Sequence, residues 1–256
     1  MNLKYITCSD PREFNDIHDI VKLGQLSPRV EIAIQAHPSK MSPGMPRYQW
    51  TQELMQLVKG LQFYNSRNIN LAVHVNKEWC AEICKTGKFP AELQTILSQR
   101  YTLFPCKTVI GRIQLNIPAD AVPKADVDNM IQLFDENRDY KFIIQYNRNT
   151  EDLVKKIRYF SYVPFSTLYD ASGGRGISPG TWREPVFVSG DQGYSGGMSP
   201  ENVAENLDKI SAVVPFGRDV WIDAEGKLKT DDKFDIGRAQ QYIMNAENWL
   251  ARQKQR

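Results

Sequence analysis

Eight short apolar segments recur along this chain of 256 residues, and a stretch with helical periodicity separates most of them. In order along the chain, the segments are Lys4–Cys8, Val30–Ala36, Ile69–Val75, Val109–Ile117, Lys141–Tyr146, Phe165–Tyr169, Val186–Ser189 and Asp219–Ile222. Strands that alternate with helices form a parallel sheet, because each return to the same edge needs a crossover helix. Eight such units close into a barrel, so the sequence predicts a (β/α)₈ TIM barrel.

The length of the chain is close to the roughly 250 residues of a TIM barrel, so we expect residues 1–256 to form one barrel domain. The clearest helical patterns predict helices over Pro11–Leu23, Trp50–Leu61, Ser199–Val214 and Phe234–Leu250. The third of these begins Ser-Pro-Glu, a cap followed by proline and an acid, which is typical of a helix start. Only about fifteen residues separate Asp170 from Val186, so we expect a truncated or missing sixth helix.

The composition indicates a globular protein and not a disordered one. Hydrophobic residues make up 41% of the chain, which is enough for a full core, and 32 basic residues nearly balance 30 acidic ones. The sequence lacks the clustered basic face of a nucleic-acid binder and any apolar run near the ~20 residues of a membrane span. We therefore expect no nucleic-acid or membrane partner, and the absence of a signal-peptide pattern predicts a cytoplasmic location.

The four cysteines fit a reducing compartment better than a disulfide framework. Cys80 and Cys84 lie one helical turn apart, a spacing that is also compatible with a metal pair. Two cysteines on one face of an amphipathic helix are more often buried apolar residues, and no further Cys/His pair has zinc spacing. The sequence predicts no metal site.

Polar side chains follow almost every apolar segment at its carboxyl end. They include His37, His74, Gln114, Asn116 and Asp170. In a TIM barrel the carboxyl ends of the strands meet at one face, which carries the active site. We therefore expect these side chains to line one mouth, with the two histidines as part of its wall.

Two glycine-rich loops late in the chain predict an anion site. The first, Asp170–Ile177, directly follows a strand, and the second, Ser195–Val203, runs into a helix. Glycine lets backbone N–H groups approach an anion closely, and the start of a helix adds the positive end of its dipole. In TIM barrels this late region commonly binds phosphate.

The same two loops resemble phosphoribosylanthranilate isomerase of tryptophan biosynthesis. That family has an Asp, a Gly-Gly-x-Gly loop and a Trp, as in Tyr169–Trp182, and then Ser-Gly-Gly-Leu-x-Pro-Glu-Asn-Val, matched here except at Met198. A weaker similarity joins Asn70–Asn76 to the third strand of the family and Gln114–Asn116 to its fourth. The specific matches cover roughly the last ninety residues.

The resemblance implies an aldose–ketose isomerase, an intramolecular oxidoreductase that performs an Amadori rearrangement on a phosphoribosyl-amine without a cofactor. By resemblance, Asp170 is the general acid and Cys8 the general base. Arg47, Gln114 and Asn116 are expected to bind the substrate, and Gly173, Gly174, Gly196 and Gly197 its phosphate. The expected partner is a small sugar phosphate, and the expected state is a monomer or a homodimer.

Two departures from the family keep alternatives open. Alignment of strand one on Ile6 puts Thr7, not Cys8, in the position of the base, and a shift of one residue turns a side chain to the other face of a strand. Strand eight has Trp221-Ile222-Asp223 where the family has Ser-Ser-Gly. The alternative is a divergent barrel with an altered ligand and a different activity, or a ligand-binding barrel with no activity.

Overall fold

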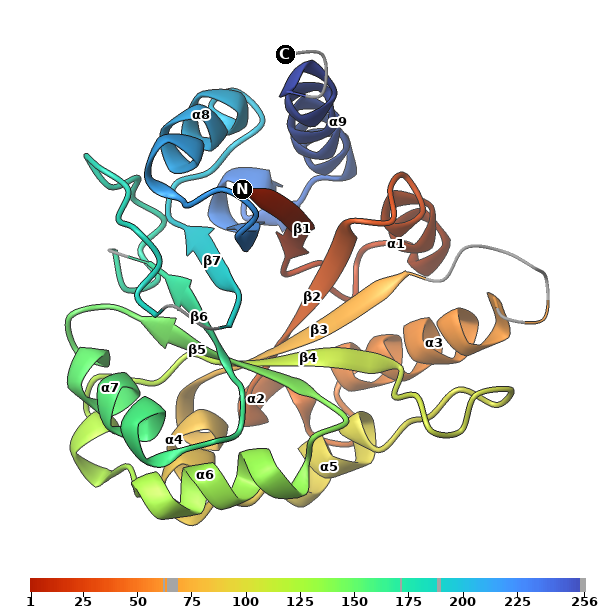
Figure 1. Cartoon of the computed structure of the whole chain (residues 1–256). Coiled ribbons are helices and arrows are strands. Elements are labelled where there is room, and N and C mark those ends of the chain that lie inside the picture. The colour runs from red at the N-terminus through yellow and green to blue at the C-terminus, as the bar shows by residue number, and fades with distance from the viewer. Residues whose placement is uncertain (62, 64–68, 171, 188–189, 254–256) are drawn as a thin grey trace.

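The computed structural model describes residues 1–61, 63, 69–170, 172–187 and 190–253, and it forms a closed barrel of eight parallel strands paired in chain order (Figure 1). The strands are β1 (Asn2–Ser9), β2 (Val30–Ala36), β3 (Asn70–Val75), β4 (Ile110–Leu115), β5 (Lys141–Tyr146), β6 (Ser166–Tyr169), β7 (Gln192–Ser195) and β8 (Asp219–Ala224). Pairing of β1 with β8 closes the ring. The predicted TIM-barrel fold is therefore confirmed.

Helices surround the barrel, and the crossovers run outside it (Figure 1). They are α1 (Ile17–Gly24), α2 (Pro38–Met41), α3 (Pro46–Leu61), α4 (Lys77–Thr86), α5 (Ala91–Leu97), α6 (Val127–Glu136), α7 (Glu151–Phe160), α8 (Val203–Val213) and α9 (Ile236–Gln253). The described residues also form the 3₁₀ helices η2 (Val122–Lys124) and η3 (Gly226–Leu228) and a small hairpin of β9 (Lys229–Thr230) and β10 (Lys233–Phe234). In the described part of the segment between β6 and β7 no residue is helical, as expected for the sixth unit. Among the described residues, no helix has the length and apolar character needed to cross a bilayer.

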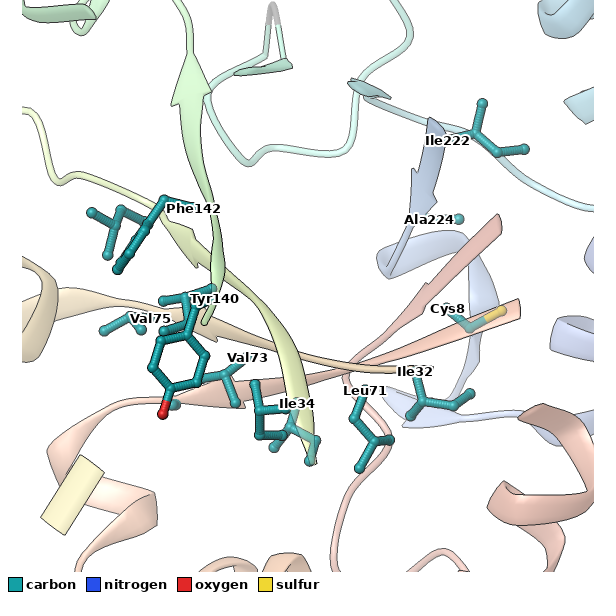
Figure 2. Close-up of a cluster of buried hydrophobic side chains, with 14 of the residues drawn as sticks. Cys8, Ile32, Ile34, Leu71, Val73, Val75, Tyr140, Phe142, Ile222 and Ala224 are labelled. Carbon is teal, nitrogen blue, oxygen red and sulfur yellow. The ribbon is translucent and has the colours of Figure 1, made fainter. Parts of the chain in front are cut away.

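Alternation along each strand divides the buried side chains into two cores. One set packs between the strands and the helices; Figure 2 draws part of it, with Cys8, Ile32 and Ile222 among the labelled side chains. The other set is a small cluster of Ile143, Leu168 and Trp221, against which Tyr5 packs. A two-residue period sends neighbouring residues of a strand to opposite faces, so this second set lies inside the barrel.

A buried ion pair accompanies the inner cluster. The Arg112 guanidinium lies 4.4 Å from the ring centre of Tyr5 and 4.2 Å from that of Trp221. Its Nη1 lies 3.3 Å from Oε1 of Glu31, which accepts a hydrogen bond of 2.9 Å from Thr7. Because aromatic faces attract a guanidinium and the carboxylate balances its charge, the barrel tolerates a buried arginine.

The prediction of strand seven was wrong. The sequence placed it at Val186–Ser189, but Val186 and Phe187 lie in a bend, and residues 188 and 189 lie outside the described residues. The strand is Gln192–Ser195, which the apolar pattern does not indicate. Its polar side chain is satisfied within the sheet, because Gln192 accepts a hydrogen bond from Thr167 and donates one to the Thr167 carbonyl.

All four predicted helices begin at other positions than expected. Helix α3 starts four residues earlier, at Pro46, and α9 two residues later, at Ile236, whereas the other two start several residues later. Helix α1 starts at Ile17 instead of Pro11, because Asp16 caps it by accepting a hydrogen bond of 2.7 Å from the N–H of His18. Helix α8 starts at Val203 instead of Ser199. The side chain of Asn202 accepts the Ser199 N–H at 2.8 Å and so stabilises a turn before the helix.

Gly193 of β7 generates a prediction about packing inside the barrel. A Cβ at this position would lie 2.2 Å from Trp221 and 2.6 Å from Leu168. We expect Gly193→Ala to lower the free energy of unfolding in urea by about 1–3 kcal/mol, as overpacking does. The matched control is Gly111→Ala in β4, where the nearest atom would be 3.9 Å away. Equal losses in both variants would contradict this account.

Candidate functional site

The carboxyl ends of the strands enclose a cavity of about 160 Å³ at the mouth of the barrel. Its lining includes the predicted site residues Gln114, Asn116, Asp170, Gly174, Gly196 and Gly197. It also includes residues that the sequence analysis had not assigned, among them Arg175, Ser195, Asp223, Glu225 and Lys227. The other three predicted residues, Cys8, Arg47 and Gly173, are not part of this lining.

A chain of amide hydrogen bonds crosses the mouth from β2 to β4. Asn76 donates to Gln35 at 2.5 Å, and Asn116 donates to Asn76 at 2.9 Å. Gln114 donates to Asn116 at 3.0 Å. These groups meet because Gln35, His74 and Gln114 are register partners on β2, β3 and β4. The arrangement presents donors and acceptors of the kind that bind hydroxyl groups.

His74 lines the same cavity, as expected, whereas His37, also expected there, is not part of the lining. Burial, together with the charge of Arg112, lowers the pKa of His74 to about 3. The ring is therefore neutral at physiological pH and contributes a donor and an acceptor instead of a charge. Among the described residues, no group of three or more His, Cys, Asp or Glu side chains is arranged to hold a metal ion.

Asp170 lies at the end of β6 and is buried, but the loop that follows it occupies its carboxylate. One oxygen accepts the N–H of Ser172 at 3.0 Å and its hydroxyl at 2.7 Å. The other oxygen accepts Gln145 Nε2 at 2.8 Å and the N–H of Gly174 at 2.6 Å. To donate a proton, Asp170 has to give up at least one of these four bonds.

The same bonds bear on the first glycine loop. The N–H groups of Ser172 and Gly174 point at the Asp170 carboxylate, and that of Gly173 donates to the Asp170 carbonyl at 3.1 Å. Gly173 also lies at a neighbouring cavity instead of the mouth. The geometry therefore does not support phosphate binding by Gly173 and Gly174.

The second glycine loop packs directly on the first. Gly196 has a φ of 114°, and a Cβ there would lie 2.8 Å from the carbonyl oxygen of Ile177. Gly197 has a φ of 63°, and its Cβ would lie 2.6 Å from the N atom of Ser178. Only glycine allows both the backbone conformation and the close approach. The two glycine loops therefore pack against each other, and Gly196 and Gly197 line the cavity.

Asp223, at the end of β8, is one of the titratable residues at the mouth to which the sequence analysis gave no role. Burial raises the pKa of Asp223 to about 7, and the charges of Glu225 and Glu31 add to this effect. A hydrogen bond of 2.6 Å from the Ser9 hydroxyl opposes the rise. The sequence did indicate a polar residue here, because Asp223 directly follows the predicted strand Asp219–Ile222. The family resemblance, however, identified Asp223 only as a difference from the Ser-Ser-Gly of the family.

The assignment of Cys8 as a base requires correction. Cys8 is fully buried in the core between the strands and the helices (Figure 2). The neighbouring Thr7 lies on the opposite face of β1, inside the barrel, where its hydroxyl donates to Glu31. Burial also raises the pKa of the Cys8 thiol well above its ordinary value. A thiol that stays protonated on the outer face of β1 cannot reach a ligand at the mouth.

Arg47 is likewise committed elsewhere. Its guanidinium is buried and lies 3.4 Å from Asp10 and 2.9 Å from Glu13. Asp10 also pairs with Arg12 and with Lys229, at 2.8 Å for the latter. Burial favours a high pKa for Asp10, but the hydrogen bonds from Arg12 and Lys229 hold it below its ordinary value. This ion-pair network ties β1 to α3 and to β9, so Arg47 acts in structure here and not in the cavity.

Comparison with known proteins supports the fold and nothing finer. The sequence matches no family model and no curated protein. A Rubisco-like protein from Rhodopseudomonas palustris superposes with a TM-score of 0.52 at 12% identity, over 97% of this chain and 65% of that one. N-(5'-phosphoribosyl)anthranilate isomerase from Pyrococcus furiosus gives 0.49 at 12% identity over 95% and 98% of the two chains. The Thermotoga maritima phosphoribosyl anthranilate isomerase gives 0.49 at 13% identity over 95% and 99%.

The raised pKa of Asp223 predicts a pH dependence of stability. The unfolded chain, with an ordinary pKa of 3.8, releases the Asp223 proton near pH 4, whereas the folded protein keeps it until about pH 7. Between these pH values only the folded protein holds the proton. The contribution to the free energy of unfolding is therefore greatest below pH 4 and falls as the pH rises to 7, by up to about 1.4 kcal/mol per pH unit.

Urea unfolding of the wild type and of Asp223→Asn at several pH values measures this effect. The difference between the two should change from pH 4 to pH 7 and stay constant above pH 8. Asp120→Asn, which changes an exposed carboxylate, is the control and should follow the wild type at every pH. A constant difference between Asp223→Asn and the wild type over the whole range would show that Asp223 is ionised throughout.

Proposed function

We propose that this chain acts on a phosphorylated sugar at the barrel mouth, as an aldose–ketose isomerase of the Amadori type on a phosphoribosyl-amine substrate. One observation carries the proposal: Asp223, with a pKa of about 7, shares a cavity with Asp170 and with the Gly196–Gly197 loop. In this proposal Asp223 takes the role that the resemblance gave to Cys8.

The chemistry of the rearrangement suits a carboxyl group of this kind. An acid first protonates the ring oxygen of the sugar, and the C1–O bond breaks as the nitrogen lone pair forms a C1=N iminium. A base then removes the proton from C2, and its electrons form a C1=C2 enolamine while the C=N electron pair returns to nitrogen. The C2 hydroxyl finally loses its proton as a proton adds at C1, which leaves a ketone at C2. A group with a pKa near the working pH both accepts and returns a proton readily. Ser9 positions the Asp223 carboxyl by its hydrogen bond, and Asp170 serves as the acid if the ligand displaces one of its four donors.

The remaining polar groups suit the rest of such a substrate. The amide chain of Asn76, Asn116 and Gln114 presents hydrogen-bonding groups to sugar hydroxyls. Gly196 and Gly197 line the cavity, and without side chains they allow their backbone N–H groups to approach a phosphate closely. Arg175 and Lys227 at the cavity supply positive charge that offsets Asp223 and Glu225.

A ligand-binding barrel without turnover is the second candidate. Two observations favour it: the loop occupies both oxygens of Asp170, and Cys8 lies outside the barrel. These are the two groups to which the resemblance assigns the chemistry. In this case the chain is a divergent barrel that binds a ligand at its mouth without converting it, and Asp223 contributes only to the shape of the cavity.

The catalytic role of Asp223 predicts a specific loss of proton transfer. In D₂O, conversion of phosphoribosylanthranilate should place deuterium at C1 of the product, which NMR detects. Asp223→Asn should slow this step by about 10²–10⁴-fold, because an amide is not a base. The wild-type rate should rise with pH through about 7 as Asp223 ionises. Full activity of the variant would place the base elsewhere, and binding without conversion by the wild type would establish the ligand-binding alternative.

The anion loop predicts a separate loss of phosphate binding. Sulfate or ribose 5-phosphate should raise the melting temperature of the wild type by mass action. Gly196→Ala should abolish the rise, because a Cβ at a φ of 114° is strained and meets the Ile177 carbonyl. Gly180→Ala, with nothing within 4 Å of the added Cβ, should keep the rise. An unchanged shift in Gly196→Ala would place the anion elsewhere.

A further inference from the structure

A second cavity lies beside the mouth, next to the segment between β6 and β7, in which no described residue is helical. It has a volume of about 610 Å³. Tyr146 and Tyr169 form part of its wall; they are register partners at the ends of β5 and β6 and belong to the outer core. Trp182 covers this outer face by packing against Tyr169, with 6.3 Å between the ring centres. A loop thus replaces the helix, and a hollow remains between the loop and α7.

Three arginines line this cavity: Arg148 after β5, and Arg175 and Arg183 in the segment between β6 and β7. All three side chains are exposed. Within the described part of the chain, none of the three forms an ion pair with an acidic side chain. The Arg175 Nε donates to the Ser172 carbonyl at 2.9 Å, which holds this guanidinium against the loop.

Among the described residues that line the cavity, Glu151 is the one acid beside three arginines, and Lys155 and Arg183 both attract its carboxylate. Glu151 pairs with Lys155 at 2.7 Å, and its carboxylate also interacts with the Tyr146 hydroxyl. Burial and this interaction raise the pKa of Tyr146 to about 12, so the phenol stays uncharged at physiological pH. The ten-residue helix α7 starts at Glu151, and its N-terminus adds the positive end of a dipole. The cavity therefore carries a positive potential.

We infer that this second cavity binds an organic phosphate of nucleotide size, with its phosphate groups between Arg148, Arg175 and Arg183. Guanidinium groups bind phosphate oxygens through paired N–H donors, and three of them match a ligand with more than one phosphate. The volume of 610 Å³ falls within the 300–1,000 Å³ usual for the pockets of small organic ligands. The tyrosine wall and the amides of Asn147 and Asn149 are suited to a planar ring and its polar edge. This inference does not depend on the isomerase proposal.

Isothermal titration of the full chain with ATP, in buffer with EDTA, tests the inference. ATP should bind, adenosine should not, and tripolyphosphate should bind more weakly than ATP because it lacks the ring. Each of Arg148→Gln and Arg183→Gln should raise the Kd for ATP about tenfold, because each removes charge-assisted hydrogen bonds. Both arginines are exposed, so the variants should keep the melting temperature of the wild type without ATP.

The matched control is the double variant Lys124→Gln/Arg252→Gln, which removes two exposed positive charges outside the cavity. It should keep the wild-type Kd. The inference is overturned if ATP does not bind at millimolar concentration, or if the control weakens binding as much as Arg148→Gln/Arg183→Gln does. Equal affinity for tripolyphosphate and ATP would overturn the inference that the cavity recognises the organic part of the ligand.

Discussion

The arrangement of the barrel depends on one buried cation, the Arg112 guanidinium between the rings of Tyr5 and Trp221. A desolvated guanidinium over aromatic faces gains about 2 kcal/mol or more, and the pair with Glu31 balances its charge. The indole of Trp221 fills the barrel below the mouth and leaves no room for a side chain at position 193. The polar cavity is therefore shallow, and Asp223 lies just above a packed, desolvated interior.

Two carboxylates at this mouth differ in what surrounds them. Asp170 accepts four hydrogen bonds from protein donors, which fix the loop at Ser172–Gly174 and leave the carboxylate engaged. Asp223 has one such donor, Ser9, and like charges of Glu31 and Glu225 near it. In the proposed function these surroundings also separate the two roles, because Asp170 has to give up a loop contact before it donates a proton, whereas Asp223 exchanges a proton without such a loss. The resemblance assigned chemistry to the first, and the geometry favours the second.

The sequence predicted the fold well because seven strands carry an apolar pattern and their spacing leaves room for crossovers. It failed at β7, since Gln-Gly-Tyr-Ser has no such pattern and becomes a strand only through its contacts with Thr167 and Trp221. Residue type at strand ends located the mouth, including Gln114, Asn116 and Asp170. It did not determine which face of β1 carries Cys8, because a change of one residue in register reverses the face.

The truncated sixth unit links the two cavities. A full helix after β6 would cover Tyr146 and Tyr169 as α7 and α8 cover their own strands, and it would fill the space in which the three arginines now lie. The segment that replaces it carries Arg175, which lines both cavities, and Ile177 and Ser178, which pack on the Gly196–Gly197 loop. A ligand on the arginine side therefore contacts the segment that supports the anion loop of the mouth. The segment between β6 and β7 thus borders both cavities, through Arg175 and through its contacts with Gly196 and Gly197.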